Sequence, residues 1–368
     1  MTLTNYWWLL IWIFIGAVLA LFIPKQQELV NGRKVERWTM PTALILIAPY
    51  IVWAGFRSNA FGDTGSYQKA FREYASSFGE IGNYLLSVTK DKGFYLLMAL
   101  EKSIFGDSCR LFFVLLAAFQ LLIIVWMFRK YSEDYWFSIF LFIASTDYIS
   151  WTFNGIRQFT AVVIAYAATP FILKKKYIPS ILLILLASTM HQSVLLMIPI
   201  IFTIQGKAWN KKTVLCILAC LAALLFVDQF TNVMDSMLAE TQYRNVVSDY
   251  KSWNDDGTNP LRVLVYSIPM ILSLIGLKYV QAENDPMINT AVGASAIVCG
   301  LYVISMVTSG IFLGRLPIYI SLWSQCILLP WEIKHMFTEK SARLVKIIAI
   351  CCYCVFFYFQ MHFTWGIL

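Results

Sequence analysis

The feature that most constrains this chain is a series of long apolar runs separated by short charged segments. A helix needs about 17 to 25 mostly apolar residues to cross a bilayer, and these runs approach that length. Their apolar residues are continuous rather than alternating, which argues against a water-filled β-barrel. Because 59% of the 368 residues are hydrophobic and 14% are charged, the sequence predicts an all-α polytopic transmembrane bundle.

We expect about twelve helices, short or broken ones included, in a single transmembrane domain over residues 1–368. The first run is expected to be a retained span, because Lys25 rather than a small-residue cleavage site follows it. The expected spans are residues 5–23, 39–55, 110–128, 135–152, 157–173, 177–190, 193–205, 213–227, 261–280, 287–309, 313–330 and 346–363.

The charge distribution predicts which ends of these spans face the cytoplasm. With the amino terminus outside, the inner segments hold 17 of the 29 Lys and Arg residues and 8 of the 21 acidic residues. Such an excess of basic residues in short loops is typical of the cytoplasmic side. The net charge of +8 is therefore explained by topology and is no argument for a nucleic-acid partner.

Two segments between spans, residues 56–109 and 228–260, are expected to be extracytoplasmic and to carry structure of their own. The first contains an amphipathic stretch at residues 66–74 and an apolar run at residues 96–105, which is too short to span and indicates an interfacial or re-entrant helix. The second is rich in aromatic residues that suit either sugar stacking or a membrane-interface belt: Tyr243, Tyr250 and Trp253. The eight cysteines lie almost entirely in apolar runs, so we expect thiols that act as small hydrophobes.

The segment 177–205 is expected to enter the membrane and return within about thirty residues, because lysines flank both its ends. Two full spans need roughly forty residues at 1.5 Å per residue. A turn near Met190-His191-Gln192 should therefore lie below the outer surface, in protein or along a wet cavity. His191 is therefore expected to lie in a cavity.

Four polar clusters recur where apolar runs end or are interrupted. We expect them to converge on one extracytoplasmic face and to form a cationic site around His191, suited to a diphosphate-linked substrate. The clusters are Arg57 with Gly62-Asp63-Thr64 and Tyr67; Asn154 with Arg157 and Gln158; His191-Gln192-Ser193; and Gly314-Arg315 with Tyr319.

Each cluster also has a purely structural interpretation. Arg157 would then pair with Asp147 or Asp63, and His191 would be a core histidine bonded to Ser193. The other two arginines would anchor helix ends at the membrane interface. No cluster of His, Asp and Glu surrounds His191, so neither a metal nor another cofactor is expected.

In these four clusters, in their order and spacing, the chain resembles the EpsG family of Wzy-type bacterial polysaccharide polymerases. The stretch Lys92-Gly93-Phe94-Tyr95, preceded by Asp91, adds to the resemblance. The resemblance implies a membrane glycosyltransferase similar to the GT-C class, located in the bacterial inner membrane with its active site facing outward. It would polymerise undecaprenyl-diphosphate-linked repeat units, with a flippase and a chain-length regulator of the same pathway as further partners.

The resemblance also implies roles for the clustered residues. His191 would deprotonate the attacking sugar hydroxyl, giving an inverting and metal-independent transfer, while Arg157 would stabilise the leaving diphosphate. Asp63 would orient His191 or bind acceptor hydroxyls. The expected substrate-binding residues are Arg57, Thr64, Tyr67, Asn154, Gln158, Gln192, Ser193, Arg315 and Tyr319.

Three alternatives stay open on the sequence alone. A flippase or transporter of lipid-linked oligosaccharides also needs arginines in a membrane cavity, but it should carry polar residues on its cytoplasmic half. A membrane acyltransferase would use a histidine within reach of a cytoplasmic acyl donor. An O-antigen ligase would share the chemistry of the polymerase and differ only in its acceptor.

Overall fold

The computed structural model describes residues 4–23, 25–30, 33–74, 77–238 and 257–368. It is mainly helical, with one two-stranded sheet among the described residues, and forms two compact units, Met1–Met197 with Arg343–Leu368 and Ile198–Ala342. The all-α prediction is confirmed, whereas the assignment of one transmembrane domain to the whole chain stays a prediction. The aromatic residues predicted in the second extracytoplasmic segment, Tyr243, Tyr250 and Trp253, lie outside the described residues.

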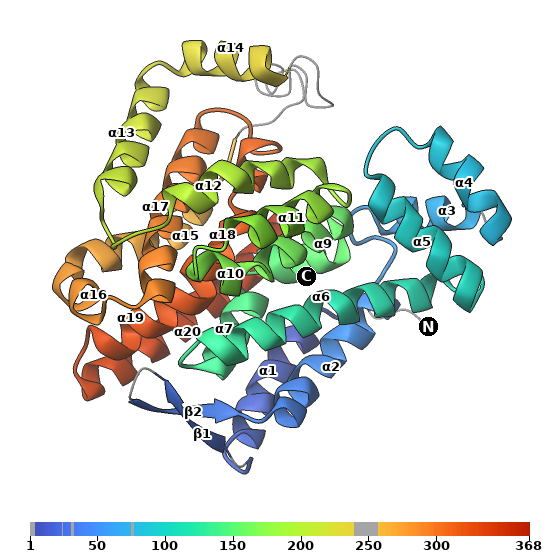
Figure 1. The fold of residues 1–368 in the computed structure, drawn as a ribbon. Helices are drawn as coiled ribbons and strands as arrows, with labels where there is room; N and C mark the ends of the chain where they lie inside the picture. The colour runs from blue at the N-terminus through green and yellow to red at the C-terminus, as the bar shows by residue number, and fades with distance from the viewer. Residues whose placement is uncertain (1–3, 24, 31–32, 75–76, 239–256) are drawn as a thin grey trace. The chain divides into compact units, whose positions relative to one another are not determined.

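The first unit contains the helices that carry most of the predicted site (Figure 1). In chain order its elements are α1 (Trp7–Leu19), β1 (Lys25–Val30), β2 (Arg33–Trp38), α2 (Met40–Phe56), α3 (Thr64–Glu73), α4 (Phe78–Ser87), α5 (Lys92–Phe105), α6 (Cys109–Tyr131), α7 (Tyr135–Ala144), α8 (Asp147–Phe153), α9 (Ile156–Tyr166), α10 (Thr169–Leu173), α11 (Tyr177–Ser188), the 3₁₀ helix η1 (Gln192–Leu196), most of α20 (Glu339–Phe359) and the π-helical end η5 (Gln360–Thr364).

Helix α6 organises the packing of this unit, because it contacts α2, α3, α5, α7 and α9. Its start is fixed by Ser108, whose hydroxyl accepts a hydrogen bond from the Leu111 N–H, as expected of an N-cap residue. A buried cluster joins it to α3, α5 and α9 through Phe71, Phe94 and Ile156. The apolar face of α6 therefore holds together the helices whose ends carry the polar residues.

The second unit, with α12 (Met197–Thr203) at its start, is also helical. Its further elements are α13 (Lys211–Leu225), α14 (Val227–Leu238), α15 (Pro260–Ile275), α16 (Leu277–Glu283), α17 (Pro286–Met306), the 3₁₀ helix η3 (Leu313–Arg315), α18 (Ile318–Trp323), the π-helix η4 (Ser324–Leu328) and α19 (Leu329–His335). Side-chain oxygens of Asn210, Asn259 and Asp285 cap the first turns of α13, α15 and α17.

Several predicted spans are broken rather than continuous. The run 135–152 forms α7 and α8, which are separated at Thr146, a non-glycine residue with φ of 64°. The run 261–280 forms α15 and α16 with a bend of 76°. The apolar pattern predicts the length of a run but not a backbone break inside it.

By length and composition, four helices of the described part are long and apolar enough to cross a membrane, or up to six if each bent pair counts as one span. Five shorter apolar helices accompany them. The four long ones are Cys109–Tyr131, Ile156–Leu173, Pro286–Met306 and Glu339–Thr364.

An antiparallel hairpin that was not predicted from the sequence lies between the first two helices. Strands β1 and β2 pair in register from Lys25 opposite Trp38 to Val30 opposite Arg33. Glu28 forms ion pairs with Arg37 at 3.1 Å and with Arg129, near the end of α6, at 3.5 Å. The pair with Arg37 links the two strands, and the pair with Arg129 joins the hairpin to the end of α6 that carries the basic residues.

A buried lysine fixes the short helix α3, which carries part of the predicted site. Lys102 of α5 is only 4% exposed, and its Nζ donates to the carbonyl oxygens of Phe71, Arg72 and Tyr74 at 2.9 to 3.1 Å. These carbonyls lie at the carboxyl end of α3, where backbone acceptors lack helical partners and the helix dipole favours a cation.

Replacing this lysine tests whether it holds α3 in place. Lys102→Met should cost about 2 kcal/mol, because it leaves buried carbonyl groups without donors, and should lower the unfolding midpoint in detergent. The matched control is Lys69→Met on α3. Lys69 is 79% exposed, and its ion pair with Glu73 is long at 4.0 Å. We expect that control to change stability by less than about 0.5 kcal/mol. Equal effects of the two substitutions would contradict the capping role.

Candidate active site

Arg157 lies in the first turn of α9, which neighbouring side chains hold rigidly. Gln120 of α6 donates from Nε2 to the Ile156 carbonyl at 3.2 Å and to Thr160 Oγ1 at 2.9 Å. Gly155 precedes the helix because a Cβ there would come within 1.6 Å of the Trp151 ring. The guanidinium therefore extends from a fixed helix start, where free backbone N–H groups favour anions.

The partner that the structure gives Arg157 is Asp91, at the start of α5. Arg157 Nη1 lies 2.7 Å from Asp91 Oδ2, and the carboxylate side chain is 3% exposed while the arginine is 25% exposed. The same nitrogen lies 3.4 Å from the Tyr95 hydroxyl, and the Tyr67 side chain of α3 lies near the guanidinium. A guanidinium has five N–H donors, so these partners leave capacity for a bound anion.

Asp91 also ties this arginine to the segment that carries His191. The backbone N–H of Gln192 lies near the Asp91 carboxylate and favours its charged form, and the Gly93 N–H donates to the Thr189 carbonyl at 2.9 Å. Gly93 must lack a side chain, because a Cβ would lie 2.1 Å from Thr189 Oγ1. Asp91 itself has left-handed backbone angles, φ 54° and ψ 38°, which an aspartate adopts more readily than most residues.

His191 stands between α11 and η1, at the predicted turn, in extended backbone geometry. Its Nδ1 lies 2.8 Å from the hydroxyl of Ser193, which is 7% exposed, so the ring orientation is constrained. The Arg157–Asp91 pair and the His191–Ser193 pair thus occupy one corner of the first unit.

Burial shapes the protonation of the groups around Arg157. Burial raises the pKa of Asp91 above its usual range, and Arg157, Lys90 and the Gln192 N–H oppose that rise. Burial also raises the pKa of Tyr67, against the effect of Arg157, so its phenol stays neutral at neutral pH. A neutral phenol keeps its O–H as a hydrogen-bond donor.

The first predicted cluster, around Arg57, is hydrogen-bonded to the turn before α9. Arg57 Nε donates to Thr64 Oγ1 at 2.9 Å, and Asn154 Oδ1 accepts from the Asp63 N–H at 2.6 Å. Gly62, at φ +50°, lies so close to the Asn154 side chain that a Cβ would approach within 2.2 Å. The loop before α3 and the turn between α8 and α9 are therefore held together.

The second unit carries the last predicted cluster. Arg315 ends η3 and is exposed, whereas Tyr319 in α18 is 1% exposed. The expected convergence of these two residues with the other clusters stays a prediction. Of the remaining predicted residues, Gln158 is buried in α9 and Gln192 is exposed at the start of η1.

The carboxylate that pairs with Arg157 is not one of the two that the sequence suggested. Arg157 was expected to pair with Asp147 or Asp63 if its role were purely structural, and its partner is Asp91. Asp63 is exposed, and its hydrogen bonds in the described structure are made by its backbone: the N–H donates to Asn154 Oδ1 and the carbonyl accepts from the Tyr67 N–H. The orienting role predicted for Asp63 stays a prediction. Asp91 and Tyr95 were not predicted as site residues. Asp91 directly precedes the stretch 92–95 that adds to the family resemblance, and Tyr95 is its last residue.

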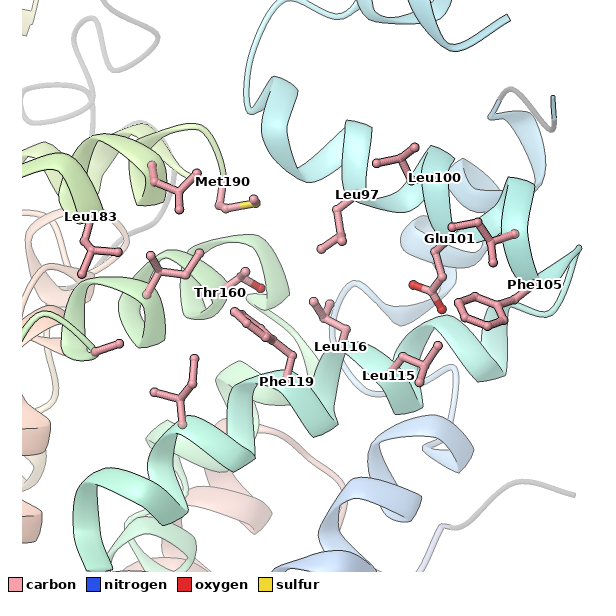
Figure 2. Close-up of a pocket in the computed structure, with 15 residues that line it drawn as sticks. Leu97, Leu100, Glu101, Phe105, Leu115, Leu116, Phe119, Thr160, Leu183 and Met190 are labelled. Atoms are coloured by element: carbon pink, nitrogen blue, oxygen red, sulfur yellow. The ribbon is translucent and has the colours of Figure 1, made fainter. Parts of the chain in front are cut away.

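An apolar groove of about 650 Å³ runs between α5, α6, α9 and α11 (Figure 2). It is lined by Leu97, Leu116, Phe119 and other apolar side chains, and it reaches Met190, the residue before His191. On α9 the groove begins at Thr160, one turn after Arg157, and extends to Ala167.

One acidic side chain enters this groove. Figure 2 shows the Glu101 carboxyl directed toward the space between α5 and α6, and burial raises its pKa from 4.5 to about 7. Its Oε1 has no hydrogen-bond partner among the described residues. At neutral pH a substantial fraction of Glu101 is therefore uncharged, which suits an apolar occupant.

Comparisons with known proteins give one match. The model of the EpsG family matches residues 42–365, a range that includes all four clusters, Asp91 and the groove. No curated protein and no solved structure matches the chain.

Exchanging the two candidate carboxylates for alanine separates their roles. Asp91→Ala should destabilise the protein by about 2–3 kcal/mol, because it leaves a largely buried guanidinium unpaired. Asp63→Ala, the matched control, should change stability by less than about 0.5 kcal/mol because that side chain is exposed. Thermal unfolding in detergent measures both, and a larger loss from the Asp63 variant would contradict the assignment.

Proposed function

Because this chain belongs to the EpsG family, we propose that it is a membrane glycosyltransferase that polymerises polyprenyl-diphosphate-linked oligosaccharide repeat units. The family supports a membrane protein of the polysaccharide-polymerase type. The proposal adds the undecaprenyl carrier, the bacterial inner membrane as location and an active site that faces the extracytoplasmic side. A flippase and a chain-length regulator of the same pathway complete the proposed partners.

The observation that carries the proposal is the pairing of a cationic centre with an apolar groove. Arg157 lies at a helix start, a quarter exposed and supported by Asp91, while the segment that carries His191 is joined to the start of α5 by the hydrogen bond from the Gly93 N–H to the Thr189 carbonyl. The groove begins one turn beyond Arg157 on α9 and reaches Met190, the residue before His191. A lipid diphosphate has an anionic head and a long apolar tail. The cationic centre matches the head, and the adjoining groove matches the tail.

The proposed reaction needs a base and a stabilised leaving group. The hydroxyl oxygen of the acceptor sugar attacks the anomeric carbon of the donor, and His191 takes the hydroxyl proton. The bond between the anomeric carbon and the diphosphate oxygen breaks on the opposite face, so the configuration inverts. Arg157, with the Tyr67 hydroxyl, stabilises the negative charge of the departing polyprenyl diphosphate, and no metal enters this scheme.

In this proposal the other two residues of the corner orient the reacting groups, and residues near it position the substrate. Ser193 orients the His191 ring, and Asp91 orients Arg157. Gln192 and Asn154 bind sugar hydroxyls near the reacting atoms, with Gln158 supporting them from α9. Arg315 and Tyr319 of the second unit are proposed to complete the substrate site.

Product formation tests the proposal. Purified protein in detergent, given lipid-diphosphate repeat units, should yield a ladder of products on a gel. His191→Ala should slow the reaction about 10²- to 10⁴-fold, and Arg157→Lys about 10²- to 10³-fold, because a base and a bidentate donor are removed. The controls are His362→Ala and Arg343→Lys, two exposed positions outside the corner, which should leave the ladder unchanged.

The pattern of products distinguishes the competing functions. Addition of a single unit without a ladder would indicate a ligase. Binding without any turnover by the folded wild-type protein would indicate a transporter. Either result would contradict the polymerase.

A groove-filling substitution tests the lipid assignment. Ala167 lies about 15 Å along the helix from Arg157, so Ala167→Trp should obstruct the lipid tail and leave the reacting atoms untouched. We expect KM to rise at least tenfold for a long polyprenyl donor and to stay unchanged for a donor with two isoprene units. Ala219→Trp, at an exposed position on α13, is the matched control. An equal loss for both donors would contradict a tail in this groove.

A further inference from the structure

A second, polar pocket of about 400 Å³ lies between the end of α2, helix α3 and the start of α6. It is lined by three arginines, Arg57, Arg72 and Arg110, together with neutral polar side chains that include Gln68, Asn59 and Ser108. Arg157 and His191 do not line it. The pocket is therefore separate from the proposed reaction centre.

The charges in this pocket are not balanced by the protein. Its one carboxylate, Asp107, lies 3.2 Å from Lys102 Nζ and is already paired. In the described part of the chain, none of the three arginines forms an ion pair with a carboxylate. A site with excess guanidinium groups favours an anionic ligand, because the planar fork can donate two hydrogen bonds to one oxyanion.

Arg57 makes this a built site rather than a basic surface. It is only 2% exposed, its Nε donates to Thr64 at 2.9 Å, and its guanidinium carbon lies 3.8 Å from the centre of the Phe113 ring. Its Nη2 is buried and has no hydrogen-bond partner among the described residues. A desolvated cation with an unused donor costs free energy unless a ligand satisfies it.

The neutral residues of the pocket suit the same ligand. The Gln68 amide donates to Asn59 Oδ1 at 2.7 Å, which holds both side chains at the pocket. Arg57 and Arg157 both reach α3, the first through Thr64 and the second through Tyr67, one helical turn apart. The pocket and the reaction centre are thus neighbours that share one helix.

We propose that this pocket binds an oxyanion, phosphate or carboxylate, carried by the second substrate of the reaction. The inference rests on the proposed polymerisation, in which donor and acceptor each carry a diphosphate and Arg157 serves only one of them. The oxyanion is then either the diphosphate of the acceptor lipid or a carboxylate of an acidic sugar in its repeat unit.

Cys109, which lines the pocket and is half-buried, reports its occupancy directly. The experiment follows alkylation of the purified full-length protein by N-ethylmaleimide, with Cys109 quantified by mass spectrometry and Cys216 as the internal reference. Three probes are compared at equal ionic strength: inorganic pyrophosphate, glucuronate and neutral glucose. We expect an oxyanion to slow Cys109 alkylation at least threefold and to leave Cys216 unchanged.

Variants show which arginines hold the probe. Arg72→Gln with Arg110→Gln, at two exposed positions, should abolish the protection, whereas Arg157→Gln should retain it. Lys340→Gln with Arg343→Gln removes equal charge at exposed positions elsewhere and should also retain it. Protection by pyrophosphate alone assigns the lipid diphosphate, and protection by glucuronate alone assigns an acidic sugar.

Other outcomes overturn the inference. They are protection by glucose as strong as that by the anions, no protection by any probe, or protection that Arg157→Gln removes. Because this assay needs no turnover, a failed ladder with intact protection rejects the polymerase alone. A normal ladder without protection rejects the pocket alone.

Discussion

The ion pair between Asp91 and Arg157 is the interaction on which the proposed site depends. Burying two charges costs desolvation free energy, and a pair repays it only when further hydrogen bonds complete the arrangement. In this pair the Gln192 N–H lies near the carboxylate and the guanidinium meets two tyrosines, while Asp91 Oδ1 is buried without a hydrogen-bond partner among the described residues. Asp91 therefore sets the position of the arginine, and the hydrogen bond from Gly93 to Thr189 joins the start of α5 to the segment that carries His191.

The helical scaffold explains why such a corner is stable in an apolar protein. Helix α6 packs against α3, α5 and α9, so apolar packing holds these helices together beside the polar contacts at their ends. The irregular backbone near the corner, including left-handed Asp91 and the turn at His191, is paired through Gly93 with Thr189. In a membrane, non-helical backbone of this kind is tolerated only where protein or a wet cavity satisfies it.

Part of this arrangement followed from the sequence, because run length and span ends are local properties. Arg157 and His191 stand where apolar runs start or turn, and that position alone marked them as candidates. Asp91 was not found as a partner, because 66 residues separate it from Arg157 and only the tertiary packing joins them. The hairpin was missed although Asn31-Gly32 between two polar-apolar stretches is a strong turn signal. The break at Thr146 has no local signal that we recognise in the apolar pattern.

A double-mutant cycle in kcat/KM for polymerisation tests the central claim most directly, using Asp91→Asn, Arg157→Lys and the two together. If the pair acts as one unit, the double variant should lose little more than the worse single variant, with a coupling free energy of about 1.5–3 kcal/mol. Losses that add within about 0.5 kcal/mol would show that the two residues act independently, and would contradict the central role of this ion pair in the site.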